Sequence, residues 1–166
     1  MPNEQATVPE LIVHRRFDAP IERVWQAWVQ PEAIAAWLGP KGTETHVIES
    51  NIVTGGVLRS RMDMNGQSMF AAFFYREVTP PSRLVYEHCF ADAQGAIVRP
   101  PFFEVWPLKL LTTVTFEPDA GGTRVQVSWR PLDATPEEHQ AFAEQFASMN
   151  GGWAMSFDQL AEYLGA

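Results

Sequence analysis

The chain has 166 residues, 12 Lys and Arg against 20 Asp and Glu, a net charge of −8, and 46% hydrophobic residues. This length fits one domain with a sizeable core, and the acidity argues against binding to nucleic acid or to an anionic membrane. A single cysteine, Cys89, excludes an internal disulfide framework and a multi-cysteine zinc site. The sequence shows neither a basic-then-apolar leader nor a long apolar run, so we expect a soluble cytoplasmic protein.

After a loose tail over residues 1–9, alternating apolar residues predict a first strand over 10–17. After this strand the spacing of the apolar residues becomes helical. It predicts a short helix that begins near Pro20, with Asp18 or Ala19 near its cap. A second short helix is predicted over Glu32–Leu38, ended by Gly39-Pro40. Six further strands, separated by Gly, Pro and Asn turn signals, are predicted over 43–51, 57–64, 68–78, 83–90, 111–117 and 123–130.

The last thirty residues predict one long helix over 135–164. Thr135, Pro136 and Glu138 form a helix start with a capping box. The apolar stripe of this helix recurs every three or four residues and comprises Phe142, Phe146, Met149, Trp153, Phe157, Leu160 and Leu164.

The interior pair Gly151-Gly152 is unusual in such a helix, because each interior glycine costs about 1 kcal/mol relative to alanine. Two interpretations remain open. The glycines either break the helix in two, or leave room where it crosses another element so that a molecule can sit beneath it.

The predicted fold class is α+β. A seven-stranded antiparallel sheet has one apolar face, and the terminal helix is the element long enough to cover it. We therefore expect a curved sheet wrapped around the C-terminal helix, with the two short helices between strands 1 and 2, in a single domain over residues 10–166.

Short segments spread over almost the whole chain resemble the START-like (SRPBCC) superfamily, and specifically bacterial proteins similar to the activator of heat-shock-protein-90 ATPase. These segments are Arg15-Arg16-Phe17-Asp18-Ala19-Pro20, Val24-Trp25, Trp37-Leu38-Gly39-Pro40, Gly55-Gly56, Pro80-Pro81-Ser82-Arg83-Leu84-Val85, Gly121-Gly122-Thr123-Arg124-Val125, Gly152-Trp153 and Leu160-Ala161-Glu162-Tyr163-Leu164.

The resemblance implies the helix-grip fold, with a cavity between sheet and helix that binds lipids, polyketides or other hydrophobic molecules. Some members of the superfamily are cyclases or hydrolases. The extra N-terminal domain of the eukaryotic activators has no counterpart in this sequence, which argues against a chaperone partner. The segment 91–110 is longer and richer in proline and aromatic residues than the usual connection.

Strand alternation and the helical stripe together predict the cavity lining, provided that these residues are not simply core. Ser60, Tyr86 and His88 favour a ligand site, since a solid core would place Leu or Val there and buried polar groups need partners. The candidate ligand-binding residues are Arg15, Leu58, Ser60, Met62, Phe73, Tyr75, Tyr86, His88, Phe90, Met149, Gly152, Trp153 and Phe157.

Arg15 falls on the apolar face of its strand and so needs an acidic partner, such as Glu77 or Glu87, or anchors an anion at the end of the cavity. For an enzyme, the best acid–base candidates are His88 and Tyr86. The four histidines show no metal-ligand spacing and the chain has no nucleotide-binding glycine loop, so we expect neither a metal nor a cofactor.

The segment 91–110 holds Phe102, Phe103 and Trp106, which need burial. It either covers the cavity opening or packs against a second subunit, and we slightly favour a homodimer. The function predicted from the sequence is binding of a small hydrophobic or aromatic molecule. A cyclase- or hydrolase-like enzyme using the same cavity and a co-chaperone-like interaction module are the alternatives.

Overall fold

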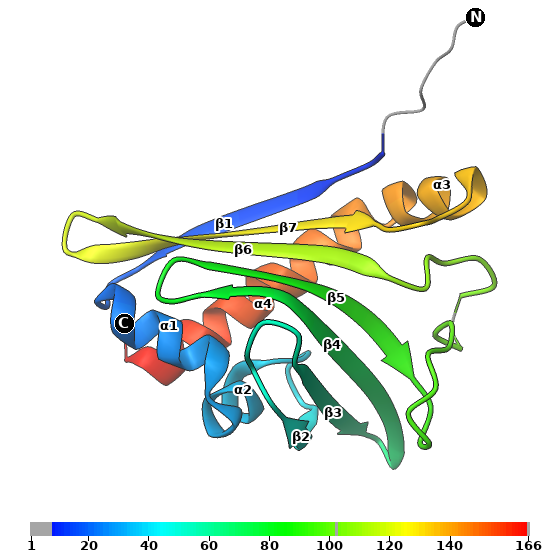
Figure 1. The fold of residues 1–166 in the computed structure, drawn as a ribbon, viewed down its shortest axis with the longest axis horizontal. Coiled ribbons are helices and arrows are strands. Elements are labelled where there is room, and N and C mark those ends of the chain that lie inside the picture. The colour runs from blue at the N-terminus through cyan, green and yellow to red at the C-terminus, as the bar shows by residue number, and fades with distance from the viewer. Residues whose placement is uncertain (1–7, 102, 166) are drawn as a thin grey trace, which may run out of the picture.

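The computed structural model describes residues 8–101 and 103–165, which form one seven-stranded sheet and four helices (Figure 1). In chain order, these elements are β1 (Leu11–Phe17), α1 (Ile21–Val29), α2 (Pro31–Trp37), β2 (Glu44–Ser50), β3 (Val57–Met64), β4 (Gln67–Thr79), β5 (Arg83–Ala91), β6 (Leu110–Asp119), β7 (Gly122–Pro131), α3 (Pro136–Glu144) and α4 (Phe146–Leu164).

The sheet is antiparallel throughout, with the order β1-β7-β6-β5-β4-β3-β2. Each strand begins and ends within two residues of its predicted bounds, because the turn residues and the alternation are both local signals. The predicted α+β helix-grip fold is therefore confirmed.

The helices cover one face of the curved sheet. Figure 1 shows α4 running along this side, with α1 and α2 at the end where the C-terminus lies. α4 packs against β1, α1 and α2, while α1 also reaches β6 and β7. Val24, Trp25 and Trp28 of α1 are buried in this layer, as the helical spacing predicts. None of the helices in the described ranges has the length and apolar character needed to cross a membrane.

The prediction of one continuous terminal helix is wrong. The capping box of Thr135 and Glu138 is present at the start of α3, but the chain leaves helical geometry at Gln145, where φ is −101° and ψ is 10°. Phe142 of α3 is fully buried and contacts Trp106, whereas α4 packs on β1, α1 and α2. The change of direction lets both helices bury their apolar residues.

Gly151 and Gly152 lie inside α4 and do not break it. Both glycines are exposed, and a Cβ atom built on either would meet no other atom within 4 Å. The expectation that they make room for a close crossing is therefore wrong, and Gly152 does not line a cavity beneath the helix. Both are helix-interior glycines on the solvent side.

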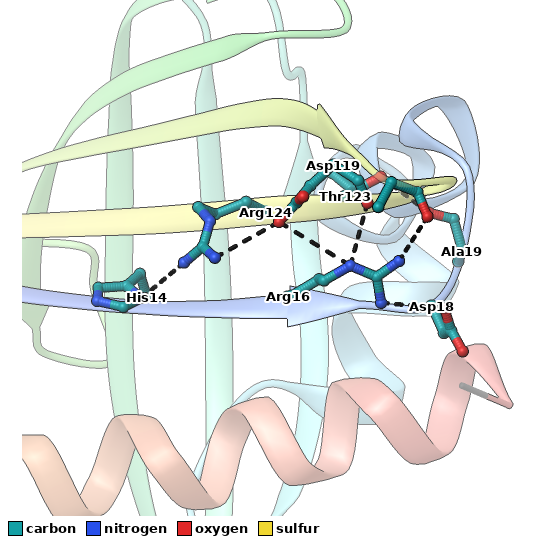
Figure 2. Close-up of polar contacts among 8 residues, drawn as sticks. His14, Arg16, Asp18, Ala19, Asp119, Thr123 and Arg124 are labelled. Atoms are coloured by element: carbon teal, nitrogen blue, oxygen red, sulfur yellow. Dashed lines mark hydrogen bonds and ion pairs between the residues drawn. The ribbon is translucent and has the colours of Figure 1, made fainter.

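The start of α1 differs slightly from the prediction, since Pro20 itself is the N-cap residue and makes no side-chain capping bond. Asp18 instead accepts a hydrogen bond from Arg16 Nη1 at 3.0 Å. Arg16 also donates to the carbonyl oxygens of Asp119 and Ala120 in the β6–β7 turn, as Figure 2 shows beside the buried Thr123. These contacts join the segment Arg15–Pro20, which carried the family resemblance, to the turn that precedes another such segment, Gly121–Val125.

Candidate ligand-binding site

Three neighbouring strands bring the predicted polar and aromatic residues onto the helix-covered face of the sheet. The register pairs Phe73 of β4 with His88 of β5 and with Leu58 of β3, and it pairs Tyr75 with Tyr86. By strand alternation, Ser60, Met62 and Phe90 lie on the same face. Trp153 and Phe157 of α4 are buried opposite the sheet.

Aromatic rings make a continuous series from β4 to α1. Phe73 stacks on Tyr86 with 4.5 Å between ring centroids, and His88 approaches the Phe73 ring edge-on at 4.9 Å. Trp129 of β7 lies 5.5 Å from His88 and 5.3 Å from Trp153. Trp153 is stacked with Trp28 of α1 at 6.1 Å. The rings therefore form a connected layer between sheet and helices.

This layer contains hydrogen-bond donors without acceptors. Within the described part of the chain, the buried indole nitrogens of Trp28, Trp129 and Trp153 have no hydrogen-bond partner. Trp37 shows the usual arrangement, because its indole N–H donates to the carbonyl of Ala27 at 2.8 Å. Buried donors are nearly always paired in proteins, so three neighbouring exceptions are a notable feature of the site.

Sequence reasoning missed two of these three donors. Trp28 and Trp129 follow the helical and the alternating apolar patterns of α1 and β7, and neither is among the predicted ligand-binding residues. The available signal was the residue type itself, since a buried Trp carries a donor that Leu or Val would not bring.

Burial holds the titratable groups of the site in their uncharged forms. It lowers the pKa of His88 to about 4, and it raises the pKa of Tyr86 and of Tyr75 well above the usual value for a phenol. At neutral pH the imidazole is therefore neutral and both phenols keep their protons. The arrangement offers hydrogen bonds but no charge to a bound molecule.

The enclosed space beneath the helices is small. A cavity of about 10 Å³ remains between Trp28, Trp37, Tyr75, Tyr86 and their neighbours, which is roughly enough for one water molecule. Binding of a ligand between sheet and helix therefore stays a prediction, and it needs more room than this cavity offers. A larger hollow of about 190 Å³ lies beside the Asp92–Gly95 turn, and residues of β3 and β4 line it, including the candidate Ser60.

The covered face is less tightly closed at several of its residues. Leu58, Trp153 and Phe157 are buried at a few per cent exposure, whereas four other candidates and one further methionine are half-buried. These half-buried residues are Met62, Met69, His88, Phe90 and Met149. Three of the five are methionines, whose flexible side chains adapt readily to different shapes.

Arg15 lies on the inner face beside Val13 and Phe17, as predicted, but its partner is different. Its guanidinium donates to Asp158 of α4 at 2.5 Å and lies 5.5 Å from the centre of the Phe157 ring. The predicted partners are engaged elsewhere, Glu77 with Arg83 and Glu87 with Arg76 and Lys109. Arg15 therefore joins sheet to helix.

The segment 91–110 folds back onto its own chain. Trp106 is buried, stacks on Phe103 with 4.3 Å between ring centroids, and contacts Phe142 of α3. Ala91 forms an isolated bridge with Ile97 near the start of the segment. Phe102, which we also expected to need burial, lies outside the described residues. Intramolecular packing thus accounts for the burial of Trp106.

The curved sheet, the long terminal helix and the aromatic layer between them define a START-like helix-grip protein. Residues 18–165 match the family model described as "Activator of Hsp90 ATPase homolog 1-like protein". The chain belongs to this family, as the sequence segments indicated.

Solved structures agree on the fold. A protein from Chromobacterium violaceum is 28% identical, with a TM-score of 0.71, over 95% of this chain and 97% of that chain. A protein from Arthrobacter aurescens is 23% identical, with a TM-score of 0.80, over 96% and 91% of the two chains. One from Mycobacterium smegmatis is 20% identical, with a TM-score of 0.75, over 92% and 88%. No curated protein matches the chain.

Proposed function

We propose that this protein binds a small, uncharged, largely aromatic molecule between the sheet and α4, and that the molecule carries a hydrogen-bond acceptor such as a ketone. The observation that carries the proposal is the group of three buried indole N–H donors on Trp28, Trp129 and Trp153 that lack acceptors. Each such donor costs about 1–3 kcal/mol when left unpaired, so an acceptor placed there is favoured.

The surroundings support an aromatic and uncharged ligand. Phe73, Tyr86, His88 and Trp153 offer ring faces and edges, and aromatic pairs contribute about 0.5–1.5 kcal/mol beyond area burial. His88 is neutral at pH 7, because burial lowers its pKa to about 4. A charged ligand would lose its hydration without gaining a counter-ion at this layer.

Entry requires movement of side chains, since the enclosed cavity holds about 10 Å³. Such movement costs least at the half-buried methionines of this face, Met62, Met69 and Met149. We therefore expect the ligand to enter beside His88 and Phe90 and to displace methionine side chains rather than backbone.

The test uses the dye prodan, a naphthyl ketone whose emission shifts when it leaves water. Wild-type protein should bind it saturably, and Trp153→Phe, which keeps a ring but removes the N–H donor, should weaken binding about 2- to 10-fold. Trp106→Phe is the matched control, because this buried Trp packs against α3 and should leave the affinity unchanged.

Native mass spectrometry of the freshly purified protein complements the titration by detecting a co-purifying small molecule. Absence of saturable prodan binding up to about 100 μM, together with absence of any bound mass, would refute the proposal. Equal losses of prodan affinity in Trp153→Phe and Trp106→Phe would also count against the proposal, since the indole N–H of Trp153 would then make no specific contribution.

A further inference from the structure

A second group of ligating side chains lies on the edge strand β2 and its neighbour β3, on the face of the sheet opposite the helices. Glu44 and His46 are two residues apart on β2, so their side chains share one face, and Glu44 pairs directly with Asp63 across the strands. One ligand atom from each residue lies within 4.8 Å of the others. Thr45 between them points to the opposite face and is buried.

The distances within this group fit a shared ion better than hydrogen bonds. His46 Nε2 is 3.5 Å from Glu44 Oε1 and 3.4 Å from Asp63 Oδ2, and among the described residues the His46 ring makes no side-chain hydrogen bond. Zinc bound to nitrogen and oxygen at about 2.0–2.2 Å in a tetrahedron separates its ligands by about 3.3–3.6 Å. The two separations that involve His46 fall within that range, and the Glu44 and Asp63 oxygens lie within 4.8 Å of each other.

Two neighbouring side chains orient the carboxylate of Asp63. Ser68 Oγ donates to Asp63 Oδ1 at 2.7 Å, and Arg61 donates to both oxygens at 3.0–3.2 Å. Such outer contacts are typical of metal-ligating carboxylates, although the charge of Arg61 opposes a cation and limits affinity.

We infer that Glu44, His46 and Asp63 form a binding site for a divalent transition-metal ion, with Zn²⁺ as the best match. One imidazole and two carboxylates suit first-row transition metals, and three protein ligands leave a fourth position for water. The bound ion would tie the edge strand β2 to β3 through side chains in addition to the backbone ladder. This inference is independent of the proposed ligand site.

Sequence inspection did not find this group because it searched for histidine pairs. The chain has a single histidine here, and the third ligand lies 17 positions beyond His46 on another strand. The register of β2 and β3 brings the three side chains together.

The experiment titrates Zn²⁺ into protein purified without a histidine tag, in competition with a chromogenic chelator. We expect one Zn²⁺ per chain, with binding weakened at least tenfold in His46→Gln and in Glu44→Gln. The side chains of His46 and Glu44 are 45% and 79% exposed, so both variants should fold, which circular dichroism checks. His139→Gln is the matched control, because His139 lies on α3, and it should bind Zn²⁺ like wild type.

A Co²⁺ titration provides a second readout, since four-coordinate Co²⁺ gives strong visible bands that the His46→Gln variant should lose. Absence of Zn²⁺ binding up to about 1 mM would overturn the inference and leave the group as a surface ion-pair cluster. Binding that persists unchanged in His46→Gln, or that is lost in His139→Gln, would overturn it equally.

Discussion

Gly122 of β7 lies directly against the backbone of Phe17 at the end of β1. A Cβ atom on Gly122 would come within 2.4 Å of the Phe17 carbonyl oxygen and within 2.7 Å of Arg16 Nη2. Next to it, Thr123 donates its buried hydroxyl to the carbonyl of Ala19 at 2.8 Å. The first strand is thereby held against the β6–β7 hairpin, where α1 begins and where Arg16 contacts the turn (Figure 2).

Gly122→Ala should destabilise the protein by about 1–3 kcal/mol, because the added methyl group meets a backbone carbonyl that cannot move aside cheaply. Urea denaturation measures the free energy of unfolding. Gly152→Ala is the matched control, since the same methyl group there meets no atom within 4 Å. If Gly122→Ala left the free energy of unfolding unchanged, β1 would be able to shift away from the new methyl group at little cost.

Gly151→Ala and Gly152→Ala should each stabilise the protein by about 1 kcal/mol. Both positions are exposed and lie inside α4, so alanine lowers the entropy cost of helix formation without a clash. Thermal or urea unfolding of the single and double variants checks this. Destabilisation by either change would mean that α4 approaches another element at this point after all.

His88 should make stability depend on pH. Its pKa in the folded protein is about 4, whereas an unfolded histidine titrates near 6.5. Between these values the unfolded chain binds more protons than the folded one, so stability falls as the pH decreases from about 6.5 to about 4, by up to about 3 kcal/mol.

The measurement compares urea unfolding at several pH values for wild type and His88→Phe, which keeps an aromatic ring beside Phe73 and Trp129. The variant should lose this part of the pH dependence, while His139→Gln should keep it. If wild type and His88→Phe showed the same dependence of unfolding free energy on pH, the pKa of His88 would not be lowered in the folded protein.

The ion pair between Arg15 and Asp158 should contribute little by itself. The side chain of Asp158 is 73% exposed, and exposed pairs typically give about 0–1 kcal/mol. Asp158→Asn should therefore cost less than about 1 kcal/mol, and the cost should shrink at high salt.

Arg15→Ala should cost more than Asp158→Asn, because it also removes the arginine stem and guanidinium from the Phe157 ring. Unfolding in urea at low and high salt distinguishes the two contributions. A salt-independent loss of several kcal/mol in Asp158→Asn would mean that the pair is desolvated in solution.

Much of the candidate site was predictable because strand alternation is local. The two-residue period placed Ser60, Tyr86 and His88 on one face, and the register of β3 to β5 confirms that they share it. The unpaired donors of Trp28 and Trp129 were not predictable, since hydrogen bonding depends on which acceptors surround each ring after folding.

By itself, the sequence determined the strands, the short helices, the capping box at Thr135 and the family, because these follow from neighbouring residues. Tertiary structure alone decided the break at Gln145, where the apolar stripe continues unchanged but Phe142 packs against Trp106. It also decided that Arg15 pairs with Asp158, 143 positions away, and that only about 10 Å³ remains between Trp28, Trp37, Tyr75, Tyr86 and their neighbours. Such contacts depend on the volumes and directions of side chains from distant segments, which no local pattern encodes.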